Sequence, residues 1–385
     1  EANAILVRLT GYSFIAEQKG VQFAISAMGM NKGTALRSTE VLKFGDAYRL
    51  IYNILEAPYY KQVSAGQKIT FADDSSLTIM GHFHNVYKKE GILKAAGTVS
   101  MSDSRYNSEY AIINQNRYLC LADDAEDLVG FRVKYYYRSN GSDDDELIAL
   151  TPYKNDVLSI EAGKLLIDDP GYTVKNIVYF LDNGKKNNAE ISEYADMIYN
   201  KEAYPDFDKN TISLKEGTIN LIDNNSDGVY DVIVVDTYVN VVVKGINGDD
   251  RFVIGMDNSR INLDNSAGQS VVIYGDDGSY YELGDISYGD VITVFQSKSG
   301  RKTIVYDTVS KIFDSIEAVS NDGDRITVTA GGREYEVDRN YSTSAEYILD
   351  PITLKTNTGL YLDVFGKIAG VGDDKENFSN YGYIF

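Results

Sequence analysis

The sequence predicts a mainly β, multi-domain protein in which small antiparallel β-barrel or sandwich modules follow each other in tandem after a short helical part. Three observations predict this fold class. Near Pro58 the composition changes from Ala, Leu, Ile and Met at helical spacing to Tyr, Val, Ile, Asp, Asn and Gly. Beyond that point apolar and polar residues alternate, which is typical of strands. One strand unit also occurs three times along the 385 residues, a length that suits roughly two to four domains.

Three helices are expected in the N-terminal part. Apolar residues recur at helical spacing over residues 4–9, 21–30 and 45–57, and a Gly or Pro follows each stretch closely. We expect these helices to form a compact bundle that is too small to be stable alone. Short strands are expected to follow at residues 68–71, 77–80 and 82–87.

The repeated unit consists of an apolar strand, a tight Gly turn, a second strand, a polar turn and an aliphatic strand. The three copies begin at residues 128–136, 288–295 and 358–364, and their aliphatic strands follow at residues 147–150, 303–306 and 367–371. The tight turns would lie at Gly130, Gly289 and Gly359. Such repeats are more typical of structural arrays than of enzymes.

The middle of the chain has a different pattern, with strands at residues 157–160, 177–181, 218–222 and 232–235 and a short helix at residues 192–199. The patterns divide the chain into five parts. These are a helical segment at 1–62, a first β-module at 63–150, an α+β region with an Asp-rich loop at 151–240, a second β-module at 241–310 and a third at 311–385.

The charge balance excludes one class of partner. Lys and Arg number 37 against 57 for Asp and Glu, which gives a formal net charge of −20. This excess repels phosphate backbones, so we expect no nucleic-acid partner. No run approaches ~18 consecutive apolar residues, so no membrane span is expected. The chain begins at Glu1 without Met, and we expect it to be a piece of a longer, secreted precursor.

Residues that commonly serve catalysis are scarce. The chain has two histidines, one cysteine and no tryptophan. It contains no Gly-rich phosphate loop, nucleophile elbow, HExxH or paired-Cys motif. Cys120 lies in an alternating stretch, where a buried structural role is the more frequent one. No carboxylate pair stands out as that of a glycosidase, and the lack of tryptophan argues against the usual sugar-stacking platform. We therefore predict that the protein is not an enzyme.

The most specific local pattern is an Asp-rich segment between two predicted strands. Oxygen-bearing groups occur at the spacing of a calcium loop: the side chains of Asp223, Asn225, Asp227 and Asp231, and the main-chain carbonyl of Val229. Gly228 stands at the sixth position, where such a loop turns sharply around the ion.

This segment also departs from a helix-flanked calcium loop. The twelfth position is Val234, so the bidentate Glu is missing, and the flanking segments are strands. Water or Asp236 could complete the shell of a Ca²⁺ ion. Two interpretations remain, a Ca²⁺ site and a metal-free Asp/Asn/Gly turn.

Two weaker patterns could also bind cations. His82 and His84 lie two residues apart in a predicted strand, where they would face the same side and could hold a transition metal, although strand histidines without a metal are more frequent. Acidic runs at residues 143–145, 249–250, 276–277 and 373–374 fall in predicted hairpin turns. Solvated turns are the simpler interpretation of these runs, and weak cation sites are the alternative.

The first 57 residues resemble the S-layer homology (SLH) domain of bacterial cell-surface proteins. Residues 1–12 are similar to the first helix of that domain, residues 23–33 to its second helix and Gly turn, and residues 42–53 to the start of its next repeat. The β-rich remainder is similar to regions that follow these domains in secreted proteins of clostridia and their relatives. The resemblance implies an extracellular location at the bacterial cell surface.

One departure from the family affects the expected function. A Thr-Arg pair in SLH domains helps to bind secondary cell-wall polysaccharide, and Lys43 and Phe44 occupy those positions in this sequence. Phe44 has no guanidinium group for an acidic sugar. The departure favours a packing or assembly role for the helical segment over wall anchoring.

Three functions remain open from the sequence. The favoured one is a structural subunit of a cell-surface layer or filament, which self-assembles through its β-modules with Ca²⁺ stiffening acidic loops. The 31 tyrosines suit cross-strand and intersubunit packing. The alternatives are an adhesin that binds cell-wall polysaccharide and, less favoured, a polysaccharide-active enzyme.

Overall fold

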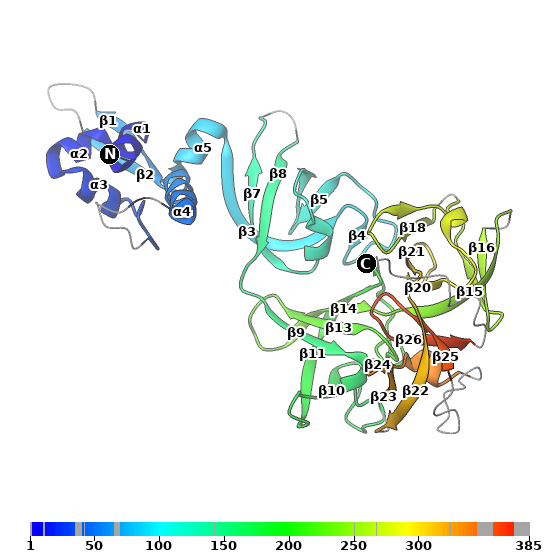
Figure 1. Cartoon of the computed structure of the whole chain (residues 1–385). Helices are drawn as coiled ribbons and strands as arrows, with labels where there is room; N and C mark the ends of the chain where they lie inside the picture. Colours follow the sequence, from blue (N-terminus) through cyan, green and yellow to red (C-terminus); the bar gives the residue numbers. More distant parts are fainter. Residues whose placement is uncertain are drawn as a thin grey trace. The chain divides into compact units, whose positions relative to one another are not determined.

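The structure is a computed structural model, and it describes residues 2–10, 12–34, 41, 43–64, 70–141, 144–249, 251–266, 268–322, 325–344 and 357–372. The chain is mainly β, with small helices near its N-terminus (Figure 1). This confirms the predicted fold class at the coarse level. None of the helices in the described ranges is long and apolar enough to cross a membrane.

The chain forms two compact units. Unit 1 comprises Glu1–Gly91, Glu109–Ala125 and Val133–Tyr153, and unit 2 comprises Ile92–Ser108, Glu126–Arg132 and Lys154–Phe385. Each unit has its own buried apolar side chains.

Unit 1 begins with helices α1 (Ala2–Leu9), α2 (Ser13–Lys19), α3 (Val21–Ala27) and α4 (Phe44–Leu55). Helices α1 and α4 match the first and third predicted helices closely. Helix α3 ends before the predicted boundary, because Gly29 adopts a left-handed φ of 67° just after it. The sequence did not predict helix α2, because its polar Ser, Glu, Gln and Lys residues leave too few apolar residues to show helical spacing. The small core of these helices includes Val7, Tyr12, Ile25, Met30 and Ile54.

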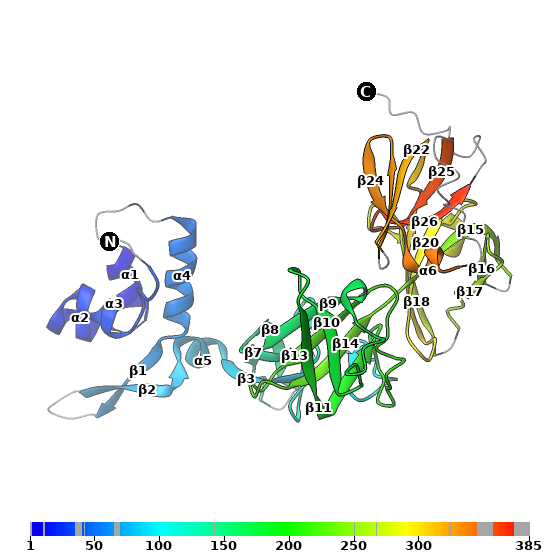
Figure 2. The ribbon, with the colours of Figure 1, turned by 90° about the horizontal axis from the view of Figure 1, so that it is seen from below.

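A hairpin of β1 (Pro58–Ser64) and β2 (Thr70–Thr78) follows, and then a short helix, α5 (Ile79–His84) (Figure 2). The strands predicted at residues 77–80 and 82–87 are therefore wrong over residues 79–80 and 82–84, and residues 68–69 of the strand predicted at 68–71 lie outside the described residues. Thr78 begins the helix instead, because its hydroxyl accepts a hydrogen bond from the Gly81 N–H at 3.1 Å.

The rest of unit 1 is built on a sheet ordered β3-β5-β6-β8-β7. Its strands are β3 (Val86–Ala96), β5 (Tyr110–Ile113), β6 (Asn116–Cys120), β8 (Glu146–Pro152) and β7 (Arg132–Arg138). Tyr118, Tyr135 and Tyr137 pack together with ring centroids 5.3–6.1 Å apart. Within unit 2, β4 (Val99–Ser100) pairs with the end of β3.

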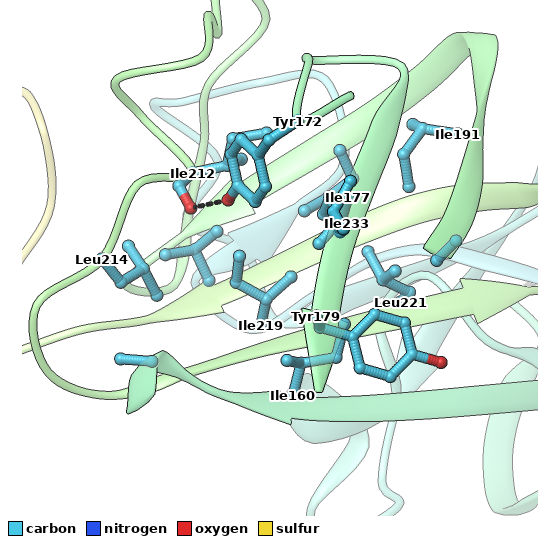
Figure 3. Close-up of a cluster of buried hydrophobic side chains, with 14 of the residues drawn as sticks. Ile160, Tyr172, Ile177, Tyr179, Ile191, Ile212, Leu214, Ile219, Leu221 and Ile233 are labelled. Atoms are coloured by element: carbon cyan, nitrogen blue, oxygen red, sulfur yellow. Dashed lines mark hydrogen bonds between the residues drawn. The ribbon is translucent and has the colours of Figure 1, made fainter. Parts of the chain in front are cut away.

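The first large sheet of unit 2 is ordered β10-β11-β14-β13-β9, with β12 paired beside β11. Its strands are β9 (Asp156–Glu161), β10 (Asn176–Phe180), β11 (Lys186–Tyr199), β12 (Glu202–Ala203), β13 (Thr218–Asp223) and β14 (Tyr230–Asp236). Figure 3 shows the apolar side chains buried against this sheet, where the Tyr172 hydroxyl donates to the Ile212 carbonyl at 2.6 Å. The helix predicted at residues 192–199 is wrong, because this segment is the end of β11 and pairs in parallel with β14.

Two further sheets complete unit 2. The second is ordered β17-β16-β15-β20-β21-β18-β19, and the third β24-β23-β22-β25-β26. The strands of the second sheet are β15 (Val239–Asn247), β16 (Phe252–Gly255), β17 (Arg260–Asn262), β18 (Ser270–Tyr274), β19 (Tyr280–Tyr281), β20 (Val291–Gln296) and β21 (Lys302–Thr308). Those of the third are β22 (Lys311–Asn321), β23 (Ile326–Ala330), β24 (Arg333–Glu336), β25 (Asn357–Leu362) and β26 (Ile368–Gly372), and helix α6 (Arg339–Ser342) follows β24. Short 3₁₀ turns lie at η1 (Ala125–Leu128), η2 (Ala162–Lys164) and η3 (Leu283–Asp285).

The repeated unit predicts the hairpins better than it predicts the turns. The pairs β7–β8, β20–β21 and β25–β26 are all antiparallel neighbours, as expected. Gly130 and Gly289 have left-handed φ angles of 97° and 78°, as a tight turn requires. Gly359, however, lies inside β25 and pairs with Phe313 of β22. The first copy also begins with η1 and a turn, not with a strand.

Candidate functional site

The predicted calcium ligands lie in the turn between β13 and β14, and most of their oxygens accept hydrogen bonds from the turn itself. Asp223 accepts bonds from three backbone N–H groups, those of Asn225 (3.1 Å), Ser226 (2.6 Å) and Gly228 (2.9 Å). The side-chain oxygen of Asn225 accepts a bond from the Asp227 N–H at 2.8 Å. Left-handed φ angles of 66° at Ser226 and 88° at Gly228 close the turn. The loop is thus ordered by its own side chains.

The far side of the loop carries the ninth-position carboxylate. Asp231 accepts bonds from the Asn224 N–H at 3.1 Å and from the Asn225 side-chain amide at 3.0 Å. Burial raises the pKa of Asp231, and the charges of Asp227 and Asp223 raise it further. The charges of Asp223 and Asp227 thus act on Asp231, but in the part of the chain that the structure describes these three carboxylates are not grouped to hold a metal ion.

The structure anchors this loop within unit 2 through the buried Asn224. Its side-chain amide donates to the Gly130 carbonyl at 2.8 Å, and its own carbonyl accepts from the Arg132 guanidinium at 2.8 Å. Asp236 cannot complete a cation site here, because it pairs with Thr218 at the opposite end of the hairpin. It lies five positions after Asp231 along the strand, about 16 Å away at ~3.3 Å per residue.

The other predicted cation sites receive less support. His82 and His84 lie in α5, where two-residue spacing turns them about 200° apart, so they do not face the same side. The His82 ring stacks on Tyr59 with centroids 3.7 Å apart. Across the parts of the chain that the structure describes, no three His, Cys, Asp or Glu side chains are grouped to hold a metal ion. Cys120 is half-buried at the end of β6.

The acidic runs behave as turns where the structure describes them. Asp249 follows β15, and Asp276 and Asp277 lie between β18 and β19. Asp144 accepts hydrogen bonds from Tyr110 at 2.8 Å and Arg117 at 3.1 Å. These runs also contain Asp143, Asp250, Asp373 and Asp374, which lie outside the described residues.

Sequence reasoning missed a cavity of about 960 Å³ in unit 2. Three aromatic rings pack together along its wall. The centroid of Tyr238 lies 5.3 Å from that of Phe295 and 5.0 Å from that of Phe365. Tyr238 is buried, whereas Phe365 is 56% exposed in the turn between β25 and β26. The cavity therefore offers a ring face to solvent.

A buried carboxylate organises the polar part of this cavity. Glu216 is 3% exposed and accepts bonds from the Lys367 ammonium at 2.6 Å, the Tyr238 hydroxyl at 3.2 Å and the Arg339 backbone N–H at 2.8 Å. Burial lowers the pKa of Lys367, but its hydrogen bond to Glu216 and the charges of Glu216, Glu336 and Asp363 together outweigh that effect and leave the pKa raised. Burial also raises the pKa of Tyr238.

Two further buried carboxylates hold the turn that carries Phe365. The Asn240 amide donates to Asp338 at 3.0 Å and to Asp363 at 2.8 Å. Asp363 in turn accepts bonds from the backbone N–H groups of Phe365 at 2.9 Å and Lys367 at 2.8 Å. Burial raises the pKa of Asp363, and it raises that of Asp338 to about 7. These contacts join β15, α6 and the β25–β26 turn.

No pattern in the sequence could have predicted this cavity. Glu216, Tyr238, Phe295 and Phe365 line the cavity, yet they are far apart in the chain and belong to the turns and ends of different sheets. No protein-family model matches the chain, and no curated protein matches it. The resemblance to the SLH domain therefore remains a prediction from the quoted residues.

Proposed function

We propose that the protein is a non-enzymatic, extracellular structural subunit that assembles with copies of itself at a bacterial cell surface. The observation that carries this proposal is an unprotected sheet edge. In the part of the chain that the structure describes, β13 is the only strand paired with β9, which leaves one edge of β9 without a strand partner.

The composition of β9 suits pairing with another chain. Its four inner residues are Val157, Leu158, Ser159 and Ile160, and Val157 is 45% exposed. It contains neither Lys nor Pro, the residues that most often protect a sheet edge. A strand from a second copy can therefore add to this edge through backbone hydrogen bonds.

Calcium is part of the proposal, through the loop of Asp223, Asn225, Asp227, Val229 and Asp231. Burial raises the pKa of Asp231, the charges of Asp227 and Asp223 add to this effect, and a bound cation would offset the repulsion between these carboxylates. A Ca²⁺ ion would be held by side-chain oxygens and the Val229 carbonyl, and it would stiffen the β13–β14 hairpin next to β9.

Electron microscopy and sedimentation velocity of the full chain, with and without Ca²⁺, test assembly. We expect ordered multimers of the native chain. The Val157→Lys variant should remove them, because a charged side chain on an edge opposes strand addition. The control is Tyr194→Lys, since Tyr194 is 89% exposed but lies on the inner strand β11.

Two outcomes would contradict the proposal. One is a native chain that stays monomeric in every condition. The other is a Val157→Lys variant that assembles as well as the Tyr194→Lys control while both keep the native melting temperature.

A polysaccharide-binding surface protein is the second candidate function. The observation that favours it is the aromatic cavity of unit 2, whose lining residues include none of those that resemble the SLH domain. A polysaccharide-active enzyme is less favoured, because Glu216, Asp338 and Asp363 are all buried and engaged in hydrogen bonds.

A further inference from the structure

We infer that the cavity lined by Tyr238, Phe295 and Phe365 is a binding site for an uncharged oligosaccharide. This inference goes beyond self-assembly and names a ligand class and a site for the second candidate function. The cavity volume of about 960 Å³ lies at the upper end of the ~300–1,000 Å³ of small-molecule sites, so it can hold more than one sugar ring.

The aromatic wall supplies the apolar part of such a site. A pyranose ring has an apolar face of C–H groups and a rim of hydroxyls. Phe365 is 56% exposed, and its ring contacts those of Tyr238 and Phe295, whose centroids lie 5.0 Å and 6.5 Å from its own. The turn that carries Phe365 is held by Asp363. The ring is thus preorganised, which reduces the entropy lost on binding.

The polar wall suits hydroxyl groups. Both acidic and basic side chains line the cavity: Glu161, Glu216, Asp236, Asp322 and Glu336 are the acids, and Lys164, Arg325, Arg339 and Lys367 are the bases. A hydroxyl both donates and accepts hydrogen bonds, so it can bridge a carboxylate and a neighbouring cation. A ligand with several hydroxyls can therefore form hydrogen bonds with several of these side chains.

The charges of the cavity argue against an ionic ligand. Lys367 pairs with Glu216 at 2.6 Å, Arg325 with Glu336 at 2.8 Å and Lys164 with Asp182 at 2.7 Å. A phosphate or carboxylate ligand would have to compete with these carboxylates, and it would also meet the excess negative charge of the chain. An uncharged ligand avoids both costs.

Calorimetric titration of the full chain tests the inference, with cellotetraose, chitotetraose and mannotetraose as neutral probes and tetragalacturonic acid as the charged probe. We expect at least one neutral probe to bind. Phe365→Ala should weaken that binding about tenfold, because it removes the exposed ring face. Phe365→Tyr keeps the ring and should keep the affinity.

The matched control is Phe83→Ala, because Phe83 is 57% exposed in α5 of unit 1 and lines no part of the cavity. Melting temperatures show that each variant is folded. The inference is overturned if no neutral probe binds, if only the charged probe binds, or if Phe365→Ala has no more effect than Phe83→Ala. None of these results bears on assembly through β9, so the two proposals fail independently.

Discussion

Individual buried carboxylates make the stability of unit 2 depend on pH. Asp307 of β21 is 3% exposed, and its Oδ1 atom has no hydrogen-bond partner among the residues that the structure describes. Burial raises its pKa from 3.8 to about 7, and the charges of Asp290 and Asp276 contribute. A raised pKa means that the folded state favours the protonated form. Asp307 therefore stabilises the fold most at low pH, and this stabilisation is lost as the pH rises toward 7.

Asp307→Asn should make unit 2 more stable at pH 8, by about 2–4 kcal/mol, since an amide needs no deprotonation. The gain should shrink toward pH 4, where the native carboxyl is already neutral. Chemical denaturation at several pH values measures this difference. As a control, Asp182→Asn should change little, because Asp182 is exposed beside Lys164. Equal gains at pH 4 and pH 8 would show that titration of Asp307 is not the cause.

At the scale of elements, pairing with a neighbouring strand decided the conformation of a segment whose residues locally favour a helix. Residues 192–199 include the good helix formers Glu193, Ala195 and Met197, which favours a helix locally. In the fold they extend β11, where Met197 is fully buried and pairs with Ile233 of β14. The helical pattern of α4 and the alternation in β7 needed no such correction, because their local and tertiary preferences agree.

The β13–β14 loop is an element whose calcium affinity can be measured. Calorimetry should show Ca²⁺ binding with a dissociation constant of about 10⁻⁴–10⁻³ M, the range of extracellular modules. Asp227→Asn should weaken binding, because it removes one ligand charge, whereas Asp206→Asn alters an exposed Asp outside the loop and should not. Absence of both heat and thermal stabilisation at millimolar Ca²⁺ would leave the metal-free turn as the correct interpretation.

For the whole molecule, the dominant property is its net charge of −20. Like charges repel one another across the compact state, and salt screens this repulsion. Salt also weakens exposed ion pairs such as Lys175–Glu193, but each contributes only ~0–1 kcal/mol. The balance should therefore favour the folded state at high ionic strength.

At the same pH, the melting temperature of the full chain should be higher in about 0.5 M NaCl than in about 0.02 M NaCl. Scanning calorimetry measures this difference. A comparison of magnesium chloride with calcium chloride at matched ionic strength distinguishes charge screening from specific Ca²⁺ binding. A melting temperature that falls with salt would mean that exposed ion pairs outweigh the net repulsion.

The sequence by itself determined the mainly β class, three of the helices, the three repeated hairpins and the Asp223 loop. These features depend on apolar period, turn residues and spacing, which are local properties of the chain. Only the tertiary structure decided that residues 192–199 form a strand and that Tyr238, Phe295 and Phe365 line one cavity. Such outcomes depend on contacts between residues distant in the chain, and the burial and pairing energy of those contacts exceeds the local preferences that a sequence displays.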